Sequence, residues 1–416
     1  MQQILEELPE SLDETYERIL REIRKSNQGH AHRLLQCLVA AARPLRVKEL
    51  AEVLAFDFSA EGIPNLNPSW RWEDQEEAVM SACSSLVVIV RDGDSQIVQF
   101  SHFSVKEFLT ANRLAEPIRD VSRYHIRLEA AHMILARACL GALLQLDERA
   151  DSSNIEGFPL ARYAAQYWAT HARFENASSR IKDGMKSLFD ANKPHFATWL
   201  WIYNEDRDGR SMTTMCPWRP EAVPLYYAAM LGFRDLAEHL ISEHPEHVNA
   251  KGGREVTSMH VAARAGHAEI LSLLLEHGAE VDCRGIDGQT PLHRASLNAK
   301  GEAGQCLLDR GTDIDAGNSR DQTPLFHAVF YGHVDFARML LERGARVNAH
   351  DNRLGRTALH WAVGKRNIQA VRLLLEHGAD VNAPDKLGRT PSQLGSELNA
   401  LEIVELLSEY GSRFEK

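Results

Sequence analysis

The chain has 416 residues, of which 44% are hydrophobic and 25% are charged. This composition indicates a soluble globular protein of two or three domains, and it excludes collagen-like, low-complexity and wholly disordered chains. The formal net charge is −11, and each half of the chain carries more Asp and Glu than Lys and Arg. Neither half offers the basic surface that a nucleic-acid backbone requires, so no nucleic-acid partner is expected.

Cysteines and apolar stretches indicate where the protein resides. The six cysteines form no Cys-x-x-Cys pair, which favours free thiols in a reducing compartment over disulfides or a zinc site. The chain is charged from Glu6 onward, unlike a signal peptide. An uncharged stretch such as Ala78–Val90 is too short to cross a bilayer. We expect no membrane association and a cytoplasmic location, with the nucleus left open.

The front of the chain has the pattern of three helices followed by a strand hairpin. Ser11 and Glu14 have capping-box spacing, and apolar residues at helical intervals extend this first helix to about 27–29. Two further helices are expected within 32–56, with a break between them at 43–45. Another helix is expected at 78–84. A Pro-rich loop at 63–68 precedes the last of these. Strands are expected at 86–91 and 96–101, joined by the tight-turn pair Asp92-Gly93. This order is the plan of a winged helix.

Winged helices often bind DNA, so the candidate recognition segment must be weighed for that function. It contains no Lys or Arg between Arg71 and Arg91, and the acidic run 73–77 introduces it. DNA phosphates would be repelled there. A DNA-binding regulator is therefore the least favoured of the functions considered.

Two segments carry a resemblance to a known family. Residues 8–20, LPESLDETYERIL, resemble the segment that closes the helical part of fungal NACHT-type signalling ATPases. Residues 100–109, FSHFSVKEFL, resemble the winged helix that follows it, a type also found in proteins named GPI inositol-deacylases. No Gly-x-Ser-x-Gly elbow supports a hydrolase. The resemblance implies a NACHT helical end at 1–29, a winged helix at 30–115 and a helical connector at 116–220.

The same resemblance implies a nucleotide-sensing role for His102, and it directs attention to a phosphate-binding loop that the sequence lacks. In related ATPases the histidine of a Phe-x-His-x-Ser pattern, here Phe100, His102 and Ser104, approaches the nucleotide phosphates and acts as a nucleotide sensor. The alternative is a histidine that ties the hairpin to the next helix. The phosphate loop Gly-x4-Gly-Lys-Ser/Thr is missing from the chain. We expect no catalytic residue and no cofactor, with an upstream NACHT ATPase module as one candidate partner.

The second half repeats itself every 33 or 34 residues. The tetrapeptide Thr-Pro-Leu-His at 290–293 returns with substitutions at 323, 357 and 390, and upstream at 257 and 223. The threonine can cap a helix whose first residue is proline, and glycines follow where the helices must end. The pattern resembles the ankyrin repeat, with six copies over 221–416 and the last one capping. The third copy, with Ala299 for a reversing glycine and the small pair Ala303-Gly304, is a predicted weak point.

Ankyrin stacks bind proteins through their turn tips and the exposed face of each first helix, and this resemblance implies the same here. That face is rich in Tyr, Trp and Arg, the residue types that dominate interface energetics. The predicted partner-binding residues are Tyr227, Arg264, Arg294, His327, Phe330, Tyr331, Trp361 and Lys365. The alternative is that some of them pack between repeats. An exposed aromatic cluster ringed by cations predicts a partner with apolar anchors and acidic flanks across repeats three to five.

Histidines also gather at one repeat turn. His239, His244 and His247 flank a proline there, and no carboxylate or cysteine is expected to complete a metal-ligand spacing. We expect a solvated turn and no metal site.

These patterns predict a mainly α protein with a helical and winged-helix front, a helical connector and a C-terminal ankyrin-repeat solenoid. The predicted function is non-catalytic protein recognition, as the sensor or regulatory end of a NACHT-type signalling or immunity protein. The alternative is a free-standing ankyrin adaptor.

Overall fold

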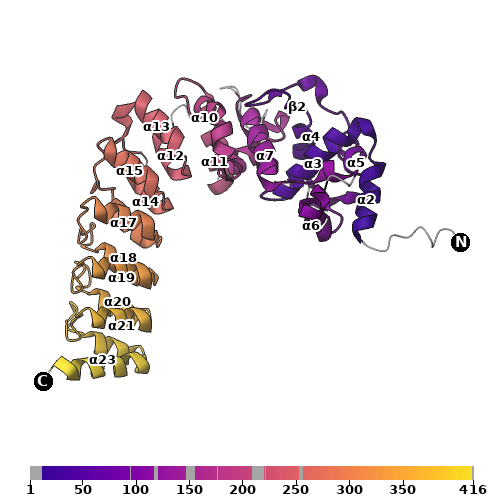
Figure 1. The fold of residues 1–416 in the computed structure, drawn as a ribbon. Coiled ribbons are helices and arrows are strands. Elements are labelled where there is room, and N and C mark those ends of the chain that lie inside the picture. The colour runs from indigo at the N-terminus through magenta and orange to yellow at the C-terminus, as the bar shows by residue number, and fades with distance from the viewer. Residues whose placement is uncertain are drawn as a thin grey trace, which may run out of the picture. The chain divides into compact units, whose positions relative to one another are not determined.

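In the computed structural model of the protein, the residues described are 12–93, 95–116, 120–146, 155–175, 177–208, 220, 222–252 and 256–414. The chain divides into two compact units, residues 1–220 and 221–416. Each unit has its own hydrophobic core. Helices dominate both of them, which confirms the predicted mainly α fold (Figure 1).

The first unit begins with the winged helix. Its helices are α2 (Leu12–Glu22), α3 (Gln28–Ala40), α4 (Val47–Val53), α5 (Gln75–Cys83) and α6 (Phe103–Thr110). Its strands are β1 (Leu45–Arg46), β2 (Phe56–Asp57), β3 (Asn65–Leu66), β4 (Val87–Asp92) and β5 (Ser95–Phe100). Antiparallel strands form a sheet in the order β1-β5-β4, and β2 pairs with β3 apart from it. The expected hairpin is present, with Gly93 in the left-handed region at φ +59°.

Two local predictions differ from the structure. The first helix ends at Glu22, and α3 already begins at Gln28, so the break between them comes earlier than expected. The proposed cap Ser11 lies outside the described residues. The two-residue strand β1 was not predicted, because its pairing with Val98 and Ile97 of β5 leaves no periodic signal in the sequence.

Helix α2 packs against the helix that closes the winged region. The Tyr16 and Phe108 rings lie 5.4 Å apart between centroids, and the Tyr16 hydroxyl is 2.7 Å from Ser104 Oγ. Residues of α2 therefore share a core with α6.

The connector is a helical layer with an aromatic core. Its helices are α7 (Leu128–Leu143), α8 (Ala161–Ala172), α9 (Ala177–Arg180), α10 (Lys182–Leu188) and α11 (His195–Asp208). Trp168 and Trp199 are both buried and meet edge to face, with centroids 5.8 Å apart. Such pairs contribute beyond the area they bury, so they fix the packing of α8 on α11.

The second unit is a stack of six helix pairs (Figure 1). The inner helices are α12 (Pro224–Leu231), α14 (Ser258–Ala265), α16 (Pro291–Leu297), α18 (Pro324–Tyr331), α20 (Ala358–Gly364) and α22 (Pro391–Glu397). The outer helices are α13 (Arg234–Glu243), α15 (Ala268–Glu276), α17 (Gly301–Asp309), α19 (Val334–Glu342), α21 (Ile368–Glu376) and α23 (Leu401–Phe414). One pair cannot bury its own apolar face, and stacking the pairs makes one continuous core.

The recurring Thr-Pro-Leu-His motif both caps a helix and joins neighbouring repeats. In the third repeat His293 Nδ1 accepts a hydrogen bond from the Thr290 backbone N–H at 3.1 Å. Its Nε2–H donates at 2.8 Å to the carbonyl of Gln322, in the next repeat. His260 and His360 make the same pair of contacts. The histidine in this motif is therefore structural.

Each inner helix reverses through a residue in the left-handed region. Three of the six repeats use glycine, and the others place Ala299, Arg366 and Asn399 there at φ +53°, +55° and +53°. A residue with a Cβ is strained in this conformation. The third repeat, which contains Ala299, also contains Gly304. A Cβ added at Gly304 would lie 2.6 Å from the ring of Phe336 in the fourth repeat, so glycine leaves room for that ring.

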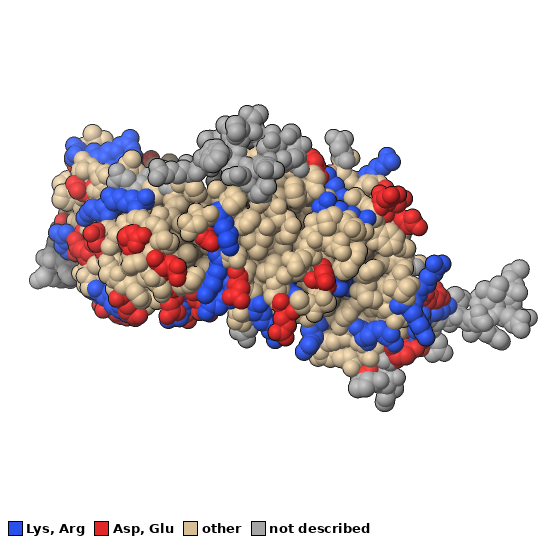
Figure 2. Space-filling view, turned by 90° about the horizontal axis from the view of Figure 1, so that it is seen from above, with Lys and Arg blue, Asp and Glu red and all other residues tan. Residues whose placement is uncertain are grey.

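The surface has two further general features. On the face shown in Figure 2, Lys and Arg are interspersed with Asp and Glu, and no broad field of one sign is visible. Across the described residues, no helix is both long and apolar enough to cross a membrane.

Candidate protein-binding groove

A groove of about 670 Å³ runs along the inner face of the repeat unit. Its walls are the inner helices and the turn tips of the third to fifth repeats. The lining residues are Ile286, Asp287, Gln289, Leu297, Asn318, Ser319, Arg320, Gln322, Phe326, His327, Phe330, Tyr331, Asp351, Arg353, Leu354 and Trp361. This is a size and a mixed polar and apolar lining suited to part of a polypeptide segment.

Aromatic rings form one side of the groove. The Trp361 ring meets Phe330 and Phe326 edge to face, with centroids 5.2 Å and 5.5 Å away. Tyr331 is 50% exposed, whereas Phe330 and Trp361 are partly buried. The cluster predicted from the sequence therefore exists, but only Tyr331 of its three rings is fully on the surface. The other two combine packing with exposure, as the alternative interpretation expected.

The two carboxylates that line the groove are already engaged. Asp287 pairs with Arg294 at 3.2 Å. Asp351 is 2% exposed and accepts hydrogen bonds from three backbone N–H groups at 2.7–3.2 Å. Its Oδ2 also accepts one from the Trp361 indole N–H at 3.3 Å, which holds the ring in place.

Cations border the aromatic side. The Lys365 ammonium lies 4.0 Å from the centroid of the Phe330 ring, within cation–π range. Arg320 and Arg353 are exposed at the turn tips. Within the described part of the chain, none of these three side chains has an ion-pair partner.

Two buried polar side chains lie at the base of the groove. His327 is 6% exposed and Gln289 is 9% exposed. Burial, together with the neighbouring His293, lowers the pKa of His327 to about 3, so the imidazole is neutral at physiological pH. The His327 Nδ1 and Gln289 Oε1 atoms have no hydrogen-bond partner among the described residues.

The structure brings four predicted residues to the groove and places the others elsewhere. His327, Phe330, Tyr331 and Trp361 line it. Two more predicted residues contact the lining without belonging to it. Arg294 forms an ion pair with Asp287, and Lys365 lies over the Phe330 ring. Tyr227 is 9% exposed in the first repeat, and Arg264 is exposed in the second, and neither lines the groove.

Sequence reasoning missed the residues at the turn tips. Arg320 and Arg353 precede the capping threonine of their repeats by three and four residues. Because the two arginines lie at different distances from the threonine, no single position of the repeat marks both. The repeated helix positions do not include these residues, because the groove has its second wall in the turns.

His102 is exposed and caps a helix. Its Nδ1 accepts a hydrogen bond from the Ser104 backbone N–H at 3.3 Å and lies 2.6 Å from Ser104 Oγ. Because Ser104 Oγ also contacts Tyr16, His102 is linked to both α6 and α2. This geometry supplies the structural role that was the alternative to nucleotide sensing.

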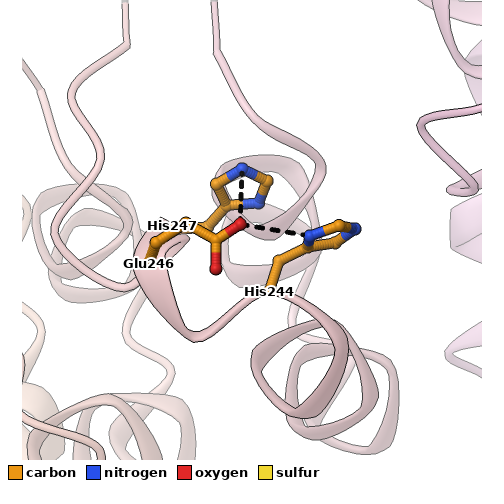
Figure 3. Close-up of side chains that lie close together, drawn as sticks. All are labelled: His244, Glu246 and His247. Carbon is orange, nitrogen blue, oxygen red and sulfur yellow. Dashed lines mark hydrogen bonds and ion pairs between the residues drawn. The ribbon is translucent and has the colours of Figure 1, made fainter.

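The turn after α13 corrects a prediction about metal ligands. Glu246 Oε1 lies 3.2 Å from His244 Nδ1 and 3.9 Å from His247 Nε2, so a carboxylate does complete the group (Figure 3). Spacing along the chain did not point to Glu246, because it does not show which side chains the turn brings together. The three side chains are 39%, 66% and 24% exposed in chain order. No hydrogen bond to another described residue orients either ring, as a built metal site would require.

Comparison with known proteins matches a segment of each unit to a family model. The family model described as ankyrin repeats matches three times, over residues 225–318, 281–351 and 348–416. The model described as the winged helix domain of GPI inositol-deacylase matches residues 16–118. The chain therefore combines a winged helix domain of this type with ankyrin repeats, which are protein-interaction modules in general.

A curated protein is also similar to this chain. The chain is similar to azaphilone pigments biosynthesis cluster protein L of Monascus ruber, with 31% identity over 288 residues. The match covers 65% of this chain and 60% of that protein. The chain thus spans less than two thirds of this relative's length.

Proposed function

We propose that the chain is a non-catalytic recognition protein whose ankyrin groove holds a protein partner, at the regulatory end of a NACHT-type signalling protein. The observation that carries recognition is the groove itself, with aromatic rings and unpaired cations on one concave face. Trp, Tyr and Arg are the side chains most often found at the energetic centre of protein interfaces.

The regulatory part of the proposal rests on the front unit. A winged helix of the inositol-deacylase type precedes the repeats, and residues 8–20 resemble the end of a NACHT helical region. The Monascus relative is named for a pigment biosynthesis cluster, and its name states no reaction. We place the protein in the cytoplasm, consistent with five free cysteines among the described residues.

The alternative is an adaptor that carries its groove partner to another complex without any NACHT module. Mapping the 5′ end of the transcript separates the two. An in-frame Gly-x4-Gly-Lys-Ser/Thr loop upstream of Met1 supports the regulatory role. A transcript that starts without such a loop supports the adaptor.

Site-specific photo-crosslinking tests recognition by the groove. A photoreactive phenylalanine analogue replaces Tyr331 in one variant of the full chain and Arg338, exposed on α19, in a matched variant. We expect the first variant, in host-cell extract, to crosslink a discrete protein that the second does not. Equal crosslinking from both positions, or none from Tyr331, would contradict recognition at this groove.

A further inference from the structure

The charge around the groove indicates which partner it can hold, and this inference rests on the recognition function proposed above. The full chain has a formal net charge of −11. Around the groove, however, the carboxylates of Asp287 and Asp351 are compensated by Arg294 and by N–H donors. The uncompensated charge around the groove is therefore positive, whereas the net charge of the whole chain is negative.

The cations without an ion-pair partner lie in the groove lining and next to it. Arg320 and Arg353 are on the turn tips, and Lys365 follows the inner helix α20. All three side chains are exposed. Because none has an ion-pair partner in the described structure, a bound carboxylate would gain a charge-assisted contact without breaking an existing one.

The apolar surface lies between these charges. Tyr331 is 50% exposed and Ile286, at a turn tip, is 64% exposed, with Phe330 and Trp361 beside them in the lining. The Lys365 ammonium lies over the Phe330 ring, so a cation and an aromatic surface are in direct contact. An aromatic or large aliphatic side chain would bury these rings against itself and place its sequence neighbours near the cations.

We propose that the groove binds a polypeptide segment in which one aromatic or large aliphatic side chain is flanked on both sides by Asp or Glu. The anchor packs on Tyr331, Phe330 and Trp361. The flanking carboxylates meet Arg320 and Arg353 at the turn tips on one side of the anchor, and Lys365 next to the Phe330 ring on the other. A basic segment would leave the same cations facing like charge, which disfavours binding.

Three synthetic peptides test the proposal with the full chain. The first has a central Trp-Leu pair between Asp and Glu residues, the second replaces that pair with Ser-Ser, and the third replaces the acidic residues with Lys. Each carries a fluorescent label, and binding is followed by fluorescence anisotropy. We expect the first peptide to bind at least about tenfold more tightly than either of the others, and to weaken as salt is raised.

Charge-reversal variants locate the site. R353E/K365E should weaken the first peptide by about tenfold or more. The matched control R338E/R372E makes the same change in net charge on exposed residues of the outer helices α19 and α21. It should leave the affinity within about twofold.

Each other outcome overturns the proposal. Equal losses in the two double variants would mean attraction to the chain as a whole, and preference for the Lys peptide would mean a groove of the opposite selectivity. If none of the peptides binds while Tyr331 still crosslinks a partner, the acidic segment is wrong and recognition by the groove stands. If Tyr331 crosslinks nothing as well, recognition by the groove fails too.

Discussion

The histidine of the repeat motif shows how one side chain determines both local and long-range structure. As a neutral imidazole it accepts at Nδ1 and donates at Nε2, so it caps its own helix and binds the next repeat. A protonated ring would lose the accepting atom. Burial is the main cause that lowers the pKa of His293, to about 4.

This depressed pKa makes the stability of the repeats dependent on pH. Below about pH 6.5 the unfolded chain binds a proton at His293, and the folded chain does not do so until about pH 4. The free energy of unfolding therefore falls as pH falls through this window, by roughly 1–2 kcal/mol between pH 7 and pH 5 for this one group.

His293→Gln should remove that share of the pH dependence. Gln393 already fills the equivalent position of the sixth repeat, where its Oε1 accepts from the Thr390 N–H at 2.9 Å. We expect the variant to be less stable at pH 7 but to lose less stability on going to pH 5 than the unmodified chain. Urea unfolding at both pH values measures this, and parallel losses in the two proteins would refute it.

Trp361 is a packing residue as well as a groove residue. Its ring contacts Phe326 and Phe330 and its N–H donates to Asp351, so Trp361→Ala should lower the free energy of unfolding by about 2 kcal/mol. Almost no change in melting temperature would be expected only if the ring were fully exposed, and the sequence alone could not show how far each ring is buried. Tyr331→Ala is the matched variant, and a larger loss for it in thermal unfolding would contradict this assignment.

The elements of the repeat unit were predictable because a fixed period implies a fixed structure. The positions of Thr290, Thr323, Thr357 and Thr390 locate the start of four inner helices directly. The groove was only half predictable. Its helix residues recur with the repeat, whereas the hydrogen bonds that neutralise Asp351 come from a turn whose conformation the period does not encode.

The reversal after α16 is one of the elements where the sequence fits the backbone poorly. Ala299 adopts φ +53°, where glycine is free of strain. Ala299→Gly should raise the free energy of unfolding by about 0.5–1 kcal/mol, since the relief of strain exceeds the extra entropy of the unfolded chain. Asn399→Gly is the control with a smaller expected gain, because asparagine tolerates this conformation. Urea denaturation measures the free energy of unfolding of each variant. A lower value for A299G than for the unmodified chain would contradict the proposed backbone strain at Ala299.

At the scale of the whole molecule, the sequence contains no phosphate-binding loop of the form Gly-x4-Gly-Lys-Ser/Thr. Its Gly-Lys pair, Gly364-Lys365, ends helix α20 of the fifth repeat and continues with Arg366 instead of Ser or Thr. We expect the purified chain to show no ATP affinity in the micromolar range and no ATPase activity. Titration calorimetry with Mg-ATP measures this, and a saturable micromolar isotherm would overturn it.

The repeat unit should fold without the rest of the chain. In a repeat stack each helix pair is stabilised by its neighbours, so residues 221–416 contain the contacts that their fold requires. Trp361 is the single tryptophan in that range, and its contacts with Phe326 and Phe330 make its emission a probe of the fourth and fifth repeats. We expect the isolated unit to give a helical circular dichroism spectrum and one cooperative urea transition by Trp361 fluorescence.

A shorter fragment, residues 256–416, tests whether each repeat adds to the stability of the stack. It lacks the first helix pair, α12 and α13, and so loses one repeat and one interface between repeats. It should remain helical but unfold at a lower urea concentration than 221–416. If 221–416 is unfolded by both probes, the repeats depend on the front unit and the division at residue 220 does not mark an independent domain.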